Sequence, residues 1–309
     1  MTAPRPVDPL APYRERFATH TIDLSAPVIV GCSGGADSVA LLALTADAGL
    51  APVAVHVDHG LRPESAHESR HVAVLAASLG ARVDARAVEI APGSNLEERA
   101  REARYAALEA ARVEHGATAV LVAHTADDQA ETVLLNILRG AASAGLAGMS
   151  ERRGALARPL LGFRRAETTA LCEALALPSL HDPMNDDEAF RRVAVRRRVL
   201  PMLEGVAGRD LVPVLARQAE ILREESDFLD GLAHAAWPGG DGLSASALVA
   251  LPPVLARRAV RGWLGPPPPS LAEVTRVLQV AAGERRGTEL SGGRTVRRTA
   301  GQLRFEAPG

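Results

Sequence analysis

The segment Ser33-Gly34-Gly35-Ala36-Asp37-Ser38 is the part of this chain best suited to bind a phosphate. It follows the apolar run 28–30 and opens a stretch with helical periodicity at 39–44. Glycines let the backbone turn and approach an anion closely, and free amides at a helix start attract negative charge. Asp37 would repel a phosphate unless a divalent cation lay between them. The segment predicts a phosphate-binding loop with a metal-binding carboxylate; the alternative is a tight turn capped by Ser38.

The chain contains no lysine, so all 35 of its Lys and Arg residues are arginine. A GxxxxGK[ST] phosphate loop is therefore excluded, because its lysine reaches the phosphates. Schiff-base chemistry on a lysine amine is excluded for the same reason.

A second polar group, Asp127, Asp128 and Glu131, falls within the first turn of an expected helix, where carboxylates suit the helix dipole. Asp128 and Glu131 are three residues apart and share a face. Such a pair can hold a metal ion or an amine cation, and simple capping of the helix is the alternative. His56, His59 and His124 could be ligands, acid–base groups or stacking rings. Because no third partner stands at metal-ligand spacing, we predict no zinc site.

The elements that must position these groups alternate between strand and helix. Apolar runs predict strands at 28–30, 53–57, 83–88 and 119–123, and helical periodicity predicts helices at 36–48, 64–79, 96–115 and 127–138. This order predicts an α/β fold with a doubly wound, mostly parallel sheet. Ligands bind at the carboxyl ends of such strands. The glycine loop and the clusters at 56–62 and 124–128 all follow strands, so we expect them to form one site.

The rest of the chain reads as mainly helical. We expect a loop region at 140–163, helices at 164–177, 188–203, 211–232 and 271–282, and a β-hairpin within 288–305. Ser291-Gly292-Gly293 repeats the Ser-Gly-Gly triplet but lacks a following Asp-Ser pair and a helix. We interpret this second triplet as a turn.

Composition and charge place further bounds on the class of protein. The formal net charge is −2, but residues 256–304 contain ten Arg against three Glu, which suggests a surface for a polyanion. A solvated arginine-rich face is the alternative. Cys32 and Cys172 stand alone, so no disulfide framework or thiolate zinc site follows. Without a signal peptide or a long apolar segment, we expect a cytoplasmic protein that does not enter a membrane.

Several motifs occur together in one order along the chain. They are SGGADS, HVDHGLR, SNLEERAREARYAAL, AHTADDQAETVLLNILRGAASAGLAGM, ARPLLGFRR and HDPMNDDEAFRRVAVRRRVLPML. The first three resemble N-type ATP pyrophosphatases, also called PP-loop enzymes, whose fold is adenine nucleotide alpha hydrolase-like. The full set, over about residues 25–205, resembles the tRNA(Ile)-lysidine synthetases. This resemblance implies a catalytic domain at 1–205 and a smaller, mainly helical tRNA-binding domain at 206–309 that ends in the hairpin.

The resemblance also implies a reaction. ATP would adenylate the C2 oxygen of the wobble cytidine in a tRNA(Ile) with a CAU anticodon, with release of pyrophosphate. The ε-amine of free L-lysine would then attack C2, and AMP would leave. The modified base would pair with A instead of G, which changes the identity of the tRNA from methionine to isoleucine. Because the cytosine oxygen is a poor leaving group, adenylation is chemically necessary. Members of this family are often homodimers.

The resemblance implies roles for individual residues. Ser33, Gly34, Gly35, Ala36, Asp37, Ser38 and His59 would bind ATP, with Asp37 holding Mg²⁺. Asp128 and Glu131 would bind lysine, with Arg104 near its carboxylate, and one of these acids would also accept the ammonium proton. Arg192, Arg196 and Arg197 would contact tRNA.

The chain departs from the family pattern at two places. Thr125 stands where a second histidine is common, and Val193-Ala194 replaces Asn-Arg. The alternatives are another PP-loop tRNA-modifying enzyme, such as a thiolase, or a non-catalytic tRNA-binding paralogue. A thiolase would use paired cysteines, which Cys32 and Cys172 do not provide. The intact acids at 37, 128 and 131 argue against a paralogue without catalysis.

Overall fold

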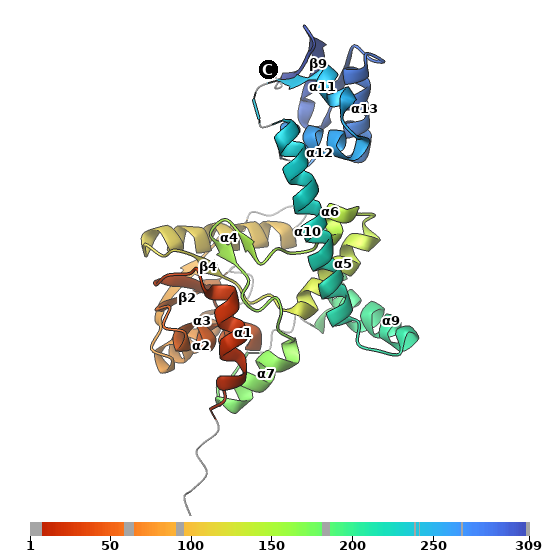
Figure 1. The fold of residues 1–309 in the computed structure, drawn as a ribbon. Coiled ribbons are helices and arrows are strands. Elements are labelled where there is room, and N and C mark those ends of the chain that lie inside the picture. The colour runs from red at the N-terminus through yellow and green to blue at the C-terminus, as the bar shows by residue number, and fades with distance from the viewer. Residues whose placement is uncertain are drawn as a thin grey trace, which may run out of the picture. The chain divides into compact units, whose positions relative to one another are not determined.

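The chain folds into two compact units, Met1–Glu220 and Ile221–Gly309 (Figure 1). The structure is a computed structural model that describes residues 8–58, 65–90, 96–180, 186–237, 239–240, 242–266 and 268–306. The expected boundary after residue 205 remains a prediction. The division between the two units falls within the residue range of helix α10 (Val212–Ala236).

The first unit contains a six-stranded sheet with the order β3-β2-β1-β4-β6-β5. Strands β1 to β4 and β6 run parallel, and β5 is antiparallel to β6. The strand bounds are β1 Val28–Gly31, β2 Pro52–Asp58, β3 Arg82–Ala87, β4 Val120–Leu121, β5 Arg152–Arg153 and β6 Leu156–Ala157. The strand order reverses between β1 and β4, which is the place where open α/β sheets bind ligands. The predicted parallel, doubly wound sheet is confirmed.

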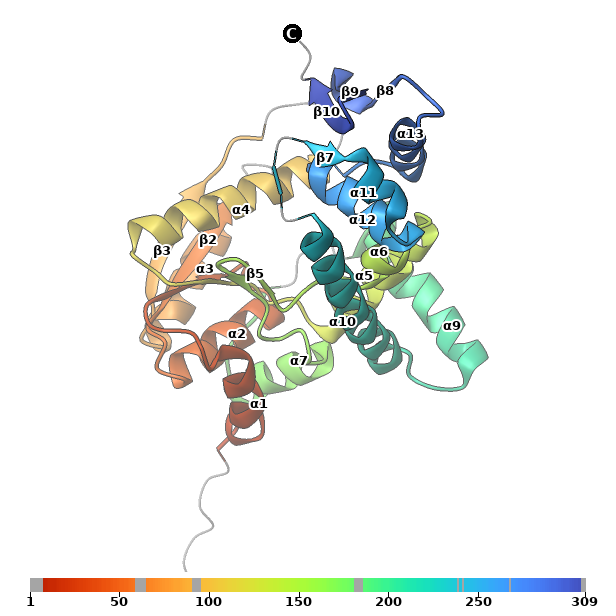
Figure 2. The ribbon, with the colours of Figure 1, turned by 45° about the horizontal axis from the view of Figure 1, so that its top comes forward.

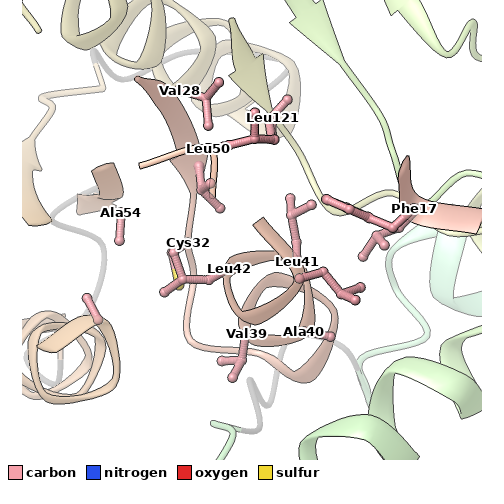
Figure 3. Close-up of a cluster of buried hydrophobic side chains, with 14 of the residues drawn as sticks. Phe17, Val28, Cys32, Val39, Ala40, Leu41, Leu42, Leu50, Ala54 and Leu121 are labelled. Carbon is pink, nitrogen blue, oxygen red and sulfur yellow. The ribbon is translucent and has the colours of Figure 1, made fainter. Parts of the chain in front are cut away.

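Helices cover both faces of this sheet (Figure 2). Helices α2 (Ala36–Asp47) and α3 (Ser65–Ser78) pack on one face with α1 (Ala11–Thr21) and α7 (Arg165–Ala174), and α4 (Leu96–Glu114) packs on the other. Every residue from Ser38 to Thr45 is buried in α2, as expected of a helix that is apolar around its whole circumference. Figure 3 shows Leu41 and Leu42 of this helix in the core, in the same cluster of buried side chains as Val28 and Leu121.

The first unit contains further helices after β4. They are α5 Ala126–Leu138, α6 Ser143–Leu146, α8 Arg191–Ala194, the π-helical turn η2 Val195–Val199 and α9 Leu200–Ala207. The region 140–163, expected to be a loop, contains α6 and the short strands β5 and β6. That expectation was wrong because strands of two residues are too short to show any periodicity.

The second unit packs helices against a four-stranded antiparallel sheet with the order β7-β10-β9-β8. Its elements are β7 Leu243–Ser244, α11 Ala245–Ala250, α12 Pro253–Leu264, α13 Leu271–Ala282, β8 Gly287–Glu289, the 3-10 turn η3 Ser291–Gly293, β9 Thr295–Thr299 and β10 Gln302–Glu306. The expected hairpin is present as β9 and β10. Buried residues of α12, α13 and the inner sheet face form its core, including Trp263, Val277, Val296 and Leu303. In the described part of the chain, no helix has the length and apolarity needed to cross a membrane.

Candidate active site

The predicted phosphate loop connects β1 to α2, as the sequence indicates. Gly34 has φ +85°, and Gly35 is the N-cap of α2 without a side-chain cap. Ser38 is buried, and its hydroxyl donates to the Gly35 carbonyl at 2.8 Å and accepts from the Ser33 amide at 3.2 Å. The two hydroxyls, Ser33 Oγ and Ser38 Oγ, lie 3.3 Å apart. The loop is thus braced from within, while the amides at the start of α2 have no capping side chain and can meet an anion.

Asp37 lies in the first turn of α2 and is half-buried. One of its oxygens accepts a hydrogen bond from the Thr168 hydroxyl, and the other lies 3.7 Å from the Arg165 Nε. Burial raises the pKa of Asp37 to about 6, with the Asp128 charge adding to the rise and Thr168 and Arg165 opposing it. A carboxyl group shifted in this direction would gain from a bound cation.

A capping box positions Asp128 at the start of α5. Asp128 Oδ2 accepts from the Thr125 amide at 2.8 Å and from the Thr125 hydroxyl at 3.0 Å. Thr125 is fully buried, so this departure from the family pattern supplies the cap of the acidic helix. Burial acts to raise the pKa of Asp128, but the guanidiniums of Arg192 and Arg165 outweigh it and lower that pKa.

Glu131 is 1% exposed and is surrounded by three guanidiniums. Arg192 Nε donates to Glu131 Oε2 at 2.8 Å, Arg196 Nε to Oε1 at 2.6 Å, and Arg165 Nη2 to Oε1 at 3.3 Å. Arg196 lies in the π-helical turn η2, a feature that is frequent at functional sites. The expected shared face of Arg192 and Arg196 therefore meets a buried carboxylate within the same unit. The Val193 departure falls on the buried apolar side of this segment.

Arg165 joins the phosphate loop to the acidic helix. Its Nη2 also donates to Asp128 Oδ1 at 3.1 Å, so one guanidinium contacts Asp37, Asp128 and Glu131 together. Thr168 and Arg165 received no role from the sequence. The sequence did contain a signal for them: Arg164 and Arg165 are the N-cap and first residue of α7. Cations at a helix N-terminus oppose the helix dipole, so their presence there indicates that carboxylates face them. Arg164 indeed pairs with Asp127, the Nε to Oδ2 distance being 3.2 Å.

Two of the three histidines expected at the strand ends, His56 and His124, are described by the structure. His56 lies 3.1 Å through Nδ1 from the Cys32 carbonyl, and within the described chain its buried Nε2 has no partner. Burial lowers the pKa of His124 to about 3; the Asp128 charge opposes this, and Arg158, Arg192 and Arg104 reinforce it. The buried Nδ1 of His124 is likewise without a partner in the described ranges. His59 and the 60–62 and HDPMN segments lie outside the described residues.

Two predicted arginines lie at the edge of this group. Arg104 is exposed on α4, with its guanidinium 5.5 Å from the ring centre of Tyr105, and its charge reaches His124. Arg197 pairs with Asp186 on the surface. A cavity of about 660 Å³ adjoins α4 beside Tyr105 and Arg158, but none of the predicted site residues lines it.

A magnesium ion beside a nucleotide needs few protein ligands, because it keeps several waters and takes the phosphates. The described residues contain no group of three or more His, Cys, Asp and Glu that could hold a metal alone. Asp37, a single carboxylate at the mouth of the phosphate loop, fits such an ion.

The outer face of the second unit's sheet contains an unusual cross-strand pair. Arg297 of β9 lies directly opposite Arg304 of β10, and both are exposed. Like charges in this position disfavour the sheet. Arg298 points to the other face, where its Nη1 donates to the Ala281 carbonyl at 2.8 Å.

Comparison with known families identifies a domain in each part of the chain. A model of the PP-loop domain matches residues 14–203, and a model of the TilS substrate binding domain matches residues 243–304. Among solved structures, the U34-tRNA thiolase NcsA from Methanococcus maripaludis, determined with its 4Fe-4S cluster, superimposes with a TM-score of 0.59 at 17% identity. The superposition covers 70% of this chain and 79% of that one, and it shows a shared fold alone.

Curated relatives narrow the family. The tRNA(Ile)-lysidine synthase of Mycobacterium tuberculosis is 46% identical over 260 residues, which cover 81% of this chain and 78% of the relative. The tRNA(Ile)-lysidine synthase of Salinispora tropica is 41% identical over an alignment that covers 97% of each protein. The resemblance seen in the motifs is thus confirmed over nearly the whole chain. The chain belongs to the tRNA(Ile)-lysidine synthases, a family of ATP-dependent ligases built on the PP-loop domain.

Proposed function

We propose that this protein joins free L-lysine to C2 of the wobble cytidine of a CAU-anticodon tRNA(Ile), through an adenylated tRNA, with release of pyrophosphate and AMP. The observation that supports this most is the contact of one guanidinium, Arg165, with Asp37, Asp128 and Glu131. This contact joins the glycine loop at the start of α2 to the acidic start of α5. A reaction in which ATP activates the oxygen on a carbon and an amine then attacks that carbon needs both groups in one site.

In the ATP half of the site, the start of α2 would bind the phosphates, with Ser33, Gly34, Gly35 and Ala36 providing the loop. Ser38 braces that loop through the Gly35 carbonyl. Asp37 would hold Mg²⁺, which when bound neutralises charge on the departing pyrophosphate. His59 remains a proposed contact to ATP.

In the lysine half, Asp128 is the proposed partner of the ε-ammonium group, with Arg104 near the lysine carboxylate. Glu131 is proposed to act with Arg192 and Arg196, because its buried carboxylate is occupied by their guanidiniums at 2.8 and 2.6 Å. These two arginines would then reach a tRNA phosphate only through the edges that do not face Glu131. Arg197 is exposed enough to contact tRNA directly.

We further propose that the Arg297 and Arg304 pair binds the phosphate backbone of the tRNA. Two opposed, exposed guanidiniums gain from a shared anion, and positioning contacts to nucleic acid are made mostly to phosphates. Replacing either with Gln should weaken tRNA binding and reduce the slope of log affinity against log salt by about 1. Arg298→Gln is the matched control, because it removes the same charge from the other face of the same strand. If the slope of log affinity against log salt is unchanged in the Arg297 and Arg304 variants, this face of the sheet does not bind the tRNA backbone.

The decisive assay incubates the full-length protein with ATP, labelled lysine and a tRNA(Ile) transcript. Label should enter the CAU transcript only when ATP is present, and should not enter a matched GAU-anticodon transcript. Binding of the transcript without incorporation would favour a non-catalytic tRNA-binding protein instead. Sedimentation of the free protein tests the homodimer that the resemblance implies.

A thiolase is the alternative that the solved-structure comparison brings forward. Burial raises the pKa of Cys172 to about 11 and also raises that of Cys32, so neither thiol is an available thiolate. Iron–sulfur clusters take several cysteine thiolates, and the chain has only two cysteines. Transfer of labelled sulfur to tRNA would be the result in favour of this alternative.

A further inference from the structure

Arg165 occupies the position that the proposed function assigns to the substrate's cation. Its guanidinium donates to Asp128 Oδ1 at 3.1 Å and to Glu131 Oε1 at 3.3 Å, and its Nε lies 3.7 Å from Asp37 Oδ2. Asp128 is the carboxylate proposed to bind the lysine ammonium, and Asp37 the one proposed to hold Mg²⁺. The protein therefore places a cation of its own between the two groups that the substrates need.

The backbone beneath this side chain is held firmly. The Arg165 amide donates to Asp127 Oδ2 at 2.8 Å, Thr168 bonds Asp37, and Cys172 bonds the Ala36 carbonyl at 3.3 Å. The Arg165 side chain, in contrast, is 29% exposed. Its guanidinium can thus change partners while α7 stays in place.

The charges in the site indicate which new partner Arg165 would take when the substrates bind. In the described site, three carboxylates (Asp37, Asp128 and Glu131) face three guanidiniums (Arg165, Arg192 and Arg196), so the group is formally neutral. A lysine ammonium added to this group would create an excess of cations. A nucleotide phosphate at the start of α2 would instead attract Arg165, the half-buried guanidinium that already contacts Asp37 beside the loop. A guanidinium is the planar donor best suited to phosphate.

We propose that Arg165 is a catalytic residue that exchanges its partners during the reaction. In the free enzyme it neutralises Asp37 and Asp128, and when ATP binds it moves to the phosphates beside Asp37. Asp128 is then left with a vacant edge for the ε-ammonium of lysine. Arg165 forms and breaks no covalent bond; it stabilises negative charge on the phosphate during adenylation and makes lysine binding depend on the nucleotide. This inference rests on the proposed function, since it takes lysine and ATP as the ligands.

The test compares Arg165→Gln with Arg164→Gln, which removes the neighbouring arginine that pairs with Asp127 and Asp210. Calorimetry measures L-lysine binding to the full-length protein with and without Mg²⁺ and α,β-methylene ATP. In the wild type, the nucleotide should raise lysine affinity by about tenfold, within the range usual for coupled sites. Arg165→Gln should raise the nucleotide-free affinity by a similar factor and abolish the coupling, whereas Arg164→Gln should leave both within about twofold.

Two further measurements separate this role from a structural one. Release of pyrophosphate on tRNA without lysine should fall about 10²-fold in Arg165→Gln, as when a donor to a reacting oxyanion is removed. The variant would thus gain in lysine affinity and lose in adenylation, whereas a merely distorted site loses in both. Norleucine, which keeps the α-ammonium but lacks the ε-ammonium, should bind equally to wild type and variant. Arg165→Lys keeps a cation and should retain the coupling.

An unchanged or lower nucleotide-free lysine affinity in Arg165→Gln, in a variant with wild-type thermal unfolding, would overturn the exchange of partners. If wild type still incorporates lysine into tRNA, the proposed function stands without this role for Arg165. If wild type incorporates none while Arg165→Gln binds lysine more tightly, Arg165 does compete with an ammonium ligand, and the reaction itself must be reassigned.

Discussion

The chain contains the triplet Ser-Gly-Gly twice, and the two copies have different surroundings. Ser33-Gly34-Gly35 leads from β1 into the twelve-residue helix α2, whose N-cap has no side-chain partner. Ser291-Gly292-Gly293 forms the 3-10 turn η3 between β8 and β9. There the amide and hydroxyl of Ser291 donate to Glu273 Oε1 at 2.7 and 2.8 Å.

The difference shows that the triplet supplies only a turn that presents donors, and that the surroundings decide which anion the donors meet. In the second unit the anion is a carboxylate of the chain itself, fixed at the start of α13. In the first unit the Ser38 hydroxyl donates to the Gly35 carbonyl of the loop, and no side chain caps the amides at the start of α2. One copy thus stabilises the fold, and the other is the one that we propose binds ATP.

The largest contrast is expected from replacing the middle glycine of each triplet with alanine. Both glycines have positive φ, +85° at Gly34 and +75° at Gly292. A Cβ at Gly34 would also lie 2.8 Å from Leu180 Cδ1, whereas one at Gly292 meets nothing within 4 Å. Gly34→Ala should therefore shift the loop and lower the rate of tRNA adenylation by about 10²-fold or more. Gly292→Ala should cost about 1 kcal/mol of unfolding free energy and leave that rate unchanged.

Those two variants are compared by pyrophosphate release and by urea unfolding. Equal losses of activity in both would mean that the first triplet acts only through general stability, and the contrast between the copies would disappear.

The next contrast lies in the carboxylates beside the two triplets, whose pKa values move in opposite directions. Burial raises the pKa of Asp37 to about 6. Its ionised form is the one that could hold Mg²⁺, so kcat/KM for ATP should fall about tenfold per pH unit below 6. Because the folded state binds this proton more tightly than the unfolded state, stability should also decrease as pH rises from about 4 to 6.

The pH profile of pyrophosphate release measures this fall in kcat/KM below pH 6, the acid limb of the profile. Asp37→Asn should be slow at every pH and should lack the limb near 6. A limb that persists in Asp37→Asn would assign it to another group.

Glu273 provides the opposite case. Hydrogen bonds from the Ser291 amide, and then from Ser270, lower its pKa to about 2. Stability from this carboxylate is fully present above its unfolded pKa near 4.5 and is lost as pH falls toward 2. Glu273→Gln should cost about 1 kcal/mol at neutral pH, a typical value for a helix cap. Urea unfolding of both proteins from pH 7 to 3 should show the difference shrinking with acid, and a difference that grows would contradict the assignment.

These contrasts also show how far the sequence could predict the molecule. The phosphate loop and the acidic start of α5 were predictable because each depends on local signals: an apolar strand, a glycine turn and a helix with acids in its first turn. The switch point that joins them followed from the parallel order of the strands. The two Ser-Gly-Gly copies were separable for the same reason, since only one precedes a helix.

The contacts across the site were not predictable in this way. Helical spacing placed Arg192 and Arg196 on one face, but it could not reveal that Glu131, 61 and 65 residues earlier, lies opposite. Likewise, nothing local connects Arg165 to Asp128. Such pairings are set by how α5, α7 and η2 pack, and packing depends on residues distant in the sequence.

The smallest contrast concerns the two serines that begin the triplets, and it should separate binding from stability. Ser291→Ala removes the hydroxyl bond to Glu273 and should cost about 1 kcal/mol of unfolding free energy with no change in the KM for ATP. Ser33 lies 3.3 Å from Ser38, which keeps its own bond to Gly35 when Ser33 is removed, so Ser33→Ala should barely alter stability. If the Ser33 hydroxyl contacts a phosphate, the KM for ATP should rise about fivefold to tenfold, as expected for one hydrogen bond to a charged group. Steady-state kinetics and urea unfolding of the two variants give four numbers. Only the crossed pattern, with binding lost at Ser33 and stability lost at Ser291, supports a loop built for an external anion and a turn built around an internal one.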